Sequence, residues 1–288
     1  SLPESFWEQS LSQSKSSLSL KDWRTEGYLA LIRNFQRRLW LLNYLTGSSP
    51  AISRSFISGQ VPAHLVAGQS ETLLSSHATS LRMGDLGYTS SAQDGLQICY
   101  NQLATYIRTL TEAIVEPYEG YASLPATRGG ELLQLNQGLL QIENEFYSAI
   151  RPKRVTESGE APVRALDSRG IEYVEVRCLD VNPFTPLGID VETTALVDSF
   201  LLSCLLEDSP PCTPDSRKMD EENNQRALNR GRDPLLRLLT ETHGEQSLEE
   251  ASQLILSSMM AAAELLDGAN NTTRHAEAVK TAQARIVG

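Results

Sequence analysis

Glu175 and Arg177 are the two residues whose types and spacing best suit chemistry. They lie in a segment, 171–181, that is rich in β-branched residues and falls between Gly170 and Pro183, which predicts a strand. Side chains alternate between the faces of a strand, so the pair shares one face, roughly 7 Å apart along the chain. A carboxylate suits Mg²⁺, and a guanidinium binds phosphate oxygens with paired donors. Together they could serve phosphoryl transfer from a metal-bound nucleotide.

The same spacing also fits a plainer arrangement, a salt bridge on the surface of a sheet, and spacing by itself favours that arrangement. Tyr173 shares the face of the pair. The opposite face carries Val174, Val176 and Cys178, which we interpret as core. The choice between ligand binding and a surface salt bridge therefore needs more than spacing.

Several familiar sites are absent from the sequence. It contains no G-x-x-x-x-G-K-[ST], G-x-G-x-x-G, H-E-x-x-H or G-x-S-x-G motif. The four histidines are isolated in sequence, and for each we expect a surface or core residue and not a ligand. The four cysteines form no C-x-x-C pair. So few cysteines in a chain of 288 residues do not suggest a secreted disulfide scaffold. No segment resembles a signal peptide, and we expect a cytoplasmic protein.

Composition narrows the class of protein further. The hydrophobic fraction of 40% and the charged fraction of 21% are typical of a folded globular protein. The net charge of −11 argues against nucleic acid as the main partner, because proteins that bind a phosphate backbone present basic surfaces. No apolar stretch is long enough to cross a bilayer, so we expect no membrane partner. Arg151, Lys153 and Arg154 form a local basic cluster, which either faces a phosphate or lies in a solvated loop.

Apolar residues at three- and four-residue steps predict the helices that must position these groups. One helix runs through 28–42 and ends at Gly47, and two others cover 96–114 and 192–206. The last helix begins at Ser247, where Glu250 completes a capping box, and ends at Gly268. Its expected inward face consists of Ala251, Leu254, Ile255, Ala262, Leu265 and Leu266.

Extended and irregular segments separate these helices. We expect long loops with short strands over 60–88, extended structure over 131–147 and a polar loop over 208–232. Helices interleaved with a few strands, in no regular alternation, indicate the α+β class and not a doubly wound sheet.

Four blocks of the sequence resemble one known family. They are LTGSSPA at 45–51, ATSLRMGDLGY at 78–88, LQIENEFY at 140–147 followed by RPKR at 151–154, and GIEYVEVRCLDVNPF at 170–184. In this order they resemble the proteobacterial type of glutamate–cysteine ligase, or γ-glutamylcysteine synthetase. The resemblance covers residues 1 to about 210 well and thins toward Gly288.

This resemblance implies an ATP-dependent carboxylate–amine ligase that acts first in glutathione biosynthesis. ATP phosphorylates the γ-carboxylate of glutamate, and the amine of cysteine then displaces phosphate from the acyl phosphate. The family fold is similar to glutamine synthetase, with an antiparallel sheet around the site, so we expect a partial version of that sheet with surrounding helices. The implied partners are glutamate, cysteine and ATP, with Mg²⁺ or Mn²⁺ as the metal.

The resemblance also implies roles for particular residues. Glu175 would be a metal ligand, and Arg177 would contact the phosphate during catalysis and nucleotide binding. Arg82 would hold a carboxylate of glutamate, where the bidentate fork of a guanidinium suits the geometry. Tyr88 and Tyr147 would line the cysteine pocket. On residue type alone, ordinary structural roles are favoured: Arg82 would be a surface arginine, and Tyr88 and Tyr147 would be core tyrosines with hydrogen-bonded hydroxyl groups.

One departure from the family pattern concerns completeness. The family's other metal-binding acidic residues and a metal-binding histidine correspond to a region upstream of residue 1, and the family also continues beyond Gly288. We therefore expect residues 1–288 to be the C-terminal portion of a catalytic domain, lacking the N-terminal part. Two alternatives stay open: a glutamate–amine ligase with a different acceptor, and a non-catalytic binding module with the same fold.

The purified chain of 288 residues is expected to have little or no ligase activity, because one metal ligand is present where several are needed. The assay is formation of γ-glutamylcysteine from glutamate, cysteine and Mg-ATP. Detectable product would refute this expectation.

Overall fold

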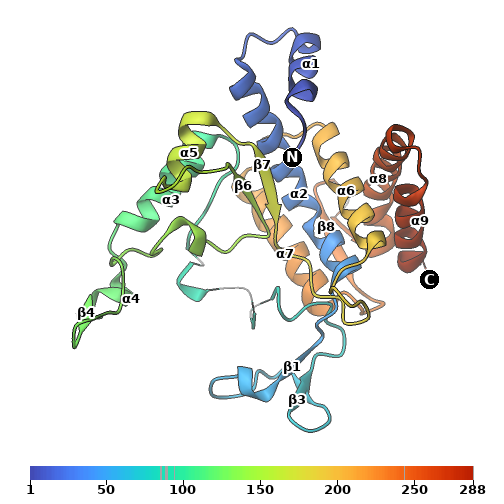
Figure 1. Ribbon diagram of the computed structural model, residues 1–288. Coiled ribbons are helices and arrows are strands. Elements are labelled where there is room, and N and C mark those ends of the chain that lie inside the picture. Colours follow the sequence, from blue (N-terminus) through green and yellow to red (C-terminus); the bar gives the residue numbers. More distant parts are fainter. Residues whose placement is uncertain (85, 88–89, 94, 243, 288) are drawn as a thin grey trace. The chain divides into compact units, whose positions relative to one another are not determined.

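The structure divides into two compact units. A computed structural model describes residues 1–84, 86–87, 90–93, 95–242 and 244–287 (Figure 1). The first unit comprises Ser1–Arg33, Thr89–Arg177 and Ser209–Cys212, and the second comprises Asn34–Tyr88, Cys178–Asp208 and Thr213–Gly288. Helix α2, Leu20–Thr46, contributes its first half to the first unit and its second half to the second.

The first unit combines helices with short antiparallel strand pairs. Besides the first half of α2, its elements are α1 (Glu4–Ser14), η2 (Ser91–Gln93), α3 (Leu103–Val115), α4 (Glu119–Ala122), β4 (Thr127–Arg128), β5 (Glu131–Leu132), η3 (Glu143–Glu145), β6 (Ile150–Lys153), α5 (Pro162–Arg169) and β7 (Tyr173–Val176). β4 pairs with β5 and β6 with β7. Trp7 of α1 packs on Tyr28 of α2, with ring centroids 5.0 Å apart. A Cβ at Gly27 would overlap the Trp7 ring, so the absence of a side chain permits this close approach.

The second unit is mainly helical. Its elements, besides the second half of α2, are β1 (Ala51–Ser53), η1 (Arg54–Phe56), β2 (Val66–Ala67), β3 (Thr72–Leu74), α6 (Val191–Leu206), α7 (Pro214–Arg230), β8 (Arg237–Thr240), β9 (Gly244–Ser247), α8 (Leu248–Asn270) and α9 (Arg274–Val287). β1, β3 and β2 form an antiparallel sheet in that order, and β8 pairs with β9. Helices with small antiparallel sheets confirm the α+β class.

The core of the second unit lies among α2, α6, α8 and α9. Figure 1 shows α6, α8 and α9 side by side, and each of the three contacts the other two. Phe35 of α2 meets Phe200 of α6 edge to face, with ring centroids 5.6 Å apart. Met259 and Ala263 of α8 are fully buried, as is Val279 of α9. Close contact between α8 and α9 is helped by the small side chains on their facing surfaces.

The helix expected from Tyr28 onward is confirmed as α2, which ends at Thr46, one residue before Gly47. Four of its polar residues are nevertheless buried: Thr25, Arg33, Asn34 and Asn43. Arg33 pairs with Glu26 at 2.7 Å and donates to the backbone oxygen of Tyr100 at 3.0 Å. Burial of a guanidinium is tolerable here because its donors are satisfied.

Two sequence predictions about helix position are wrong. The helix expected over 96–114 begins only at Leu103, because Asn101 exchanges two hydrogen bonds with the backbone of Cys212 and holds that stretch extended. The expected loop over 208–232 contains the 17-residue helix α7, Pro214–Arg230. Thr213 caps α7 with Ser216 in a capping box, and Pro214 starts it. Helix α7 contains few hydrophobic residues, so apolar periodicity could not predict it.

The helix expected from Ser247 is confirmed as α8, with its capping box, but it continues past Gly268 to Asn270. Its expected inward face is wrong at Leu254, which is 82% exposed, and at Leu265, which is 60% exposed, but Ala262 is buried as expected. The buried face is instead built from Ser252, Leu256, Met259, Ala262, Ala263 and Asp267. Contact with α6 and α9 selected this face, and α9 itself was not predicted.

No helix in the part of the chain that the structure describes has the length and hydropathy to cross a membrane. The four cysteines are free thiols. Burial raises the pKa of both Cys178 and Cys204 to about 12. A thiol that stays protonated is a poor nucleophile, so these two cysteines belong to the core.

Asp267 joins the two last helices. Its Oδ1 accepts hydrogen bonds from the Thr272 hydroxyl at 2.7 Å and the His275 N–H at 3.1 Å, and lies 2.7 Å from Nδ1 of His275. Its Oδ2 accepts from the Ala276 N–H at 2.9 Å. Burial opposes ionisation of this carboxyl, but the hydrogen bonds outweigh it and hold its pKa well below the usual range. The carboxylate therefore caps α9 from the end of α8.

Replacing Asp267 with Asn should lower the Tm and weaken its dependence on acid pH. A carboxyl with a lowered folded-state pKa contributes stability above its unfolded pKa of about 4, and that contribution is lost as pH falls further. Thermal unfolding from pH 3 to pH 7 should therefore show the largest difference between the two proteins at neutral pH. A constant difference across this range would contradict the assignment.

The pKa of Asp220 in α7 is shifted in the opposite direction from that of Asp267. Burial raises the pKa of Asp220 to about 7; Arg37 opposes the shift, whereas Glu241 and Glu221 reinforce it. The folded protein therefore retains a proton there that the unfolded chain loses at lower pH.

The variant D220N should be more stable than the unaltered protein, by a margin that grows as pH rises from about 4 to about 7 and then stays level. Stability of the unaltered protein falls across that window because ionisation of a partly buried carboxyl is disfavoured. Thermal unfolding over this range measures the margin, with D215N, in the exposed first turn of the same helix, as the matched control. If the margin shrinks as pH rises, the pKa of Asp220 is not raised in the folded protein.

Candidate functional site

The strand pair β6–β7 in the first unit carries the two residues singled out first. Arg151 lies directly opposite Glu175 in the antiparallel register, and Lys153 lies opposite Tyr173. Arg177 follows β7, and its N–H donates to the backbone oxygen of Ala149 at 2.8 Å. The strand is shorter than the predicted 171–181 segment. Because opposite residues in an antiparallel pair share a face, Glu175 and Arg151 lie on the same side.

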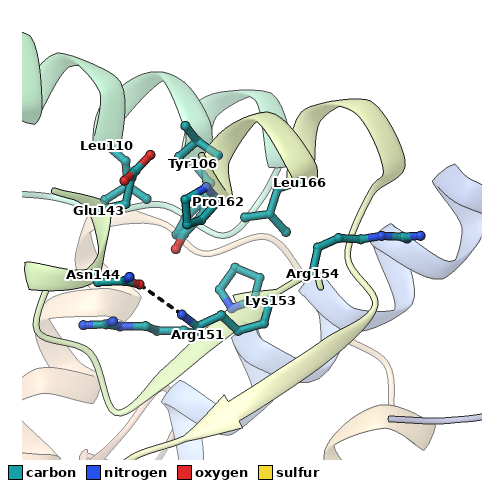
Figure 2. Close-up of a pocket in the computed structure, with 11 residues that line it drawn as sticks. Tyr106, Leu110, Glu143, Asn144, Arg151, Lys153, Arg154, Pro162 and Leu166 are labelled. Carbon is teal, nitrogen blue, oxygen red and sulfur yellow. Dashed lines mark hydrogen bonds between the residues drawn. The ribbon is translucent and has the colours of Figure 1, made fainter. Parts of the chain in front are cut away.

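The Glu175 carboxylate lies in a cationic environment. Its Oε2 is 3.5 Å from Nζ of Lys153, which also donates to Oδ1 of Asn144 at 3.2 Å (Figure 2). The side chain is 42% exposed. Its Oε2 atom is nevertheless buried and accepts no hydrogen bond from the described residues. A buried oxygen with lone pairs to spare is suited to a further ligand.

The basic cluster at 151–154 lies on β6 and just after it, not in a solvated loop. Arg151 is 5% exposed, and Figure 2 shows it pointing in the opposite direction from Arg154. Arg154 lies 3.5 Å from Glu172 and donates to the backbone oxygen of Arg169 at 2.7 Å. A small cavity beside β6 is lined by Tyr106, Leu110, Glu143, Asn144, Arg151, Pro152, Lys153, Arg154, Pro162, Val163 and Leu166. Arg151 and Lys153 are thus the members of the cluster that share a sheet face with Glu175.

The two tyrosines of the expected cysteine pocket differ in what the structure says of them. Tyr147 follows the turn η3, is 40% exposed, and donates its N–H to Oε1 of Gln93 at 3.0 Å. Tyr88 lies outside the described residues.

Arg82 lies in the second unit, where it forms an ion pair with Asp180. Its Nε is 2.7 Å from Oδ1 of Asp180, and its Nη2 donates to the backbone oxygen of Leu179 at 2.7 Å. The Arg82 side chain is 37% exposed, whereas that of Asp180 is 2% exposed. The described residues therefore hold the guanidinium at Nε and Nη2, while the side chain stays partly exposed.

Asp180 was missed by sequence analysis. Besides Arg82, it accepts hydrogen bonds from the Ser48 N–H at 2.9 Å, the Ser49 hydroxyl at 2.7 Å and the Ser80 hydroxyl at 3.0 Å. These partners come from the blocks at 45–51 and 78–88, and Asp180 itself from 170–184. The available signal was its place three residues after Arg177, but nothing in the spacing identifies its partners.

Each unit offers one kind of chemistry. The β6–β7 face places a carboxylate among cationic side chains, an arrangement suited to an anionic, metal-bound phosphate. The fixed guanidinium of Arg82 is suited to a carboxylate. No group of three or more His, Cys, Asp or Glu side chains within 1–84, 86–87, 90–93, 95–242 and 244–287 could hold a metal ion. Glu175 would supply one metal ligand, and these residues alone do not complete a metal site.

Comparisons with a family model and with curated proteins all match this chain to glutamate–cysteine ligases. Residues 1–227 match the family model described as glutamate-cysteine ligase. The chain is 45% identical over 289 aligned residues to the glutamate–cysteine ligase of Hahella chejuensis, covering 99% of this chain and 55% of that protein. It is 44% identical to that of Saccharophagus degradans, covering 100% of this chain and 54% of the relative.

Two solved structures are also similar to this chain. Glutamate–cysteine ligase from Francisella tularensis in complex with AMP superposes with a TM-score of 0.87 at 32% identity, over 99% of this chain and 55% of that one. A bifunctional glutathione synthetase from Pasteurella multocida shares the fold, with a TM-score of 0.67 at 19% identity over 99% of this chain and 31% of that one. The chain thus spans about half the length of the relatives at 44–45% identity. It belongs to the glutamate–cysteine ligase family.

Proposed function

We propose that this chain forms the C-terminal portion of the catalytic domain of an ATP-dependent glutamate–cysteine ligase, acting in the cytoplasm in the first step of glutathione biosynthesis. Family membership supports the reaction class. The observation that carries the site is the position of Glu175 among Arg151, Lys153 and Arg177 on and beside the β6–β7 pair. That the F. tularensis enzyme was crystallised with AMP supports nucleotide use.

In the proposed reaction, an oxygen of the glutamate γ-carboxylate attacks the γ-phosphorus of ATP. The bond from that phosphorus to the bridging oxygen breaks, and ADP leaves. The amine of cysteine then attacks the carbonyl carbon of the acyl phosphate, loses a proton and expels phosphate. Phosphate is a far better leaving group than oxide, so activation makes amide formation possible.

The chain's own residues serve the charged parts of this reaction. Arg177 would contact the transferring phosphoryl oxygens, whose negative charge a guanidinium neutralises. Arg82 would hold a carboxylate of glutamate, and Tyr147 with Tyr88 would line the cysteine pocket. Glu175 would hold Mg²⁺ or Mn²⁺ together with residues from outside this chain. When bound, the metal would screen charge on the phosphates of ATP.

A glutamine-synthetase-like antiparallel sheet around the site is part of this proposal. Among the described residues, β6 pairs with β7 only. Each strand therefore has a further edge at which the rest of the full-length protein could extend the sheet.

Two other functions can be separated experimentally. A ligase with another acceptor would prefer 2-aminobutyrate or alanine to cysteine as the amine substrate. A non-catalytic module would lack thermal stabilisation by ATP in the presence of Mg²⁺. Neither function has a specific observation in its favour.

The decisive variant is E175Q, made in the chain extended with its natural flanking regions to the length of its relatives. Phosphate release from Mg-ATP should require glutamate and rise with cysteine, and E175Q should lower it about a hundredfold or more, because a metal-binding charge is lost. The matched control is E172Q, three residues earlier, whose carboxylate pairs with Arg154; it should stay within a few-fold of the unaltered rate. Undiminished release by E175Q would remove Glu175 from the site, and no release from the unaltered protein with any acceptor would refute the enzyme.

A further inference from the structure

The ion pair between Arg82 and Asp180 leaves one edge of a guanidinium available. Nε is held by Oδ1 of Asp180 and Nη2 by the backbone oxygen of Leu179, both at 2.7 Å. A guanidinium is planar and carries five N–H groups, so these two contacts fix its plane. The side chain is 37% exposed. Among the described residues, no hydrogen-bond partner lies at the edge formed by Nη1 and the second N–H of Nη2, which suits that edge to bidentate contact with a carboxylate.

Asp180 is itself prevented from rotating. Its Oδ2 accepts from the Ser48 N–H and the Ser49 hydroxyl, and its Oδ1 accepts from the Ser80 hydroxyl as well as Arg82. Donors from two separate segments thus determine where both oxygens lie. The orientation of the buried carboxylate passes directly to the guanidinium bound to it.

We propose that Asp180 is a positioning residue for substrate: it presents the outer edge of Arg82 to a carboxylate of glutamate. The inference rests on the proposed function, because it takes Arg82 as the residue that binds that carboxylate. Asp180 does not touch substrate in this scheme. It acts by removing the rotational freedom that a long arginine side chain would otherwise lose on binding.

Because Arg82 is already paired with Asp180, the ion pair also affects which kind of ligand the guanidinium binds. Asp180 balances the charge of Arg82, so the pair attracts anions in general less strongly than an unpaired arginine would. What remains is directional: two parallel N–H donors that match the two oxygens of one carboxylate. Loss of Asp180 should accordingly weaken glutamate binding far more than binding of ATP or cysteine.

The test uses the chain extended to the length of its relatives, with kinetics measured separately for each substrate. D180N removes the negative charge and makes an amide nitrogen face donors, at Ser48 and Ser49 or at Ser80 and Arg82, so the guanidinium is held less firmly. We expect the KM for glutamate to rise about tenfold or more, with kcat and the KM values for ATP and cysteine within about threefold. The milder S49A, which removes one partner of Oδ2 and keeps the charge, should shift the KM for glutamate in the same direction by a smaller factor.

A double-mutant cycle with R82A separates positioning from a general loss of structure. If Asp180 acts through Arg82, D180N should have no further effect on the KM for glutamate in the R82A background. The matched control is D267N, which also removes a buried, multiply hydrogen-bonded carboxylate from the second unit; it should lower the Tm and leave that KM unchanged.

Three results would overturn the proposal. One is an unchanged KM for glutamate in D180N and S49A with an active unaltered protein, which would leave the proposed function standing. Another is equal and additive effects of D180N with and without Arg82, which would indicate a purely structural role. Absence of γ-glutamylcysteine from the unaltered protein would overturn the proposed function and this inference together.

Discussion

A carboxylate removed from water is costly unless its oxygens are hydrogen-bonded and its charge is balanced, and Asp180 meets this requirement with four partners. Those partners come from segments about 100 and 130 residues away in sequence. Removing any one would leave a buried charge less than fully satisfied. The segments at 48–49 and 80–82 must therefore meet the end of the block that begins at Gly170. The position of Arg82 follows from that meeting.

The first unit handles charge differently. Glu175 is partly exposed, faces a lysine at 3.5 Å, and lies opposite a buried arginine in the strand register. At 3.5 Å and with both side chains partly exposed, this ion pair adds little to stability. Its value lies in keeping a carboxylate and cationic groups together on a short strand pair, where backbone hydrogen bonds fix their spacing. The same block supplies Asp180 to the second unit five residues later. One stretch of sequence thus provides an ion pair with a buried carboxylate and another whose glutamate side chain is partly exposed.

Much of the local structure was predictable because its causes are local. Apolar periodicity predicted α2 and α6, and the capping box of Ser247 and Glu250 predicted the start of α8. Where causes were distant, prediction failed. Asn101 delays the start of α3 through hydrogen bonds to Cys212. Helix α7 is polar, and its buried residues are Asn223, Ala227 and Leu228. The buried face of α8 was chosen by α6 and α9, which left Leu254 exposed.

The sequence by itself determined the family, through four blocks of matching residues. Through the two-residue period of a strand it also predicted one face for Glu175 and Arg177, although β7 ends at Val176, one residue before Arg177. It also determined residue types suited to phosphate, metal and carboxylate. Only the tertiary structure decided that Arg151 lies opposite Glu175, that Lys153 reaches its Oε2, and that Asp180 holds Arg82. The physical reason is that periodicity and capping act over a few residues, whereas neutralisation of a buried charge recruits partners that only folding brings together.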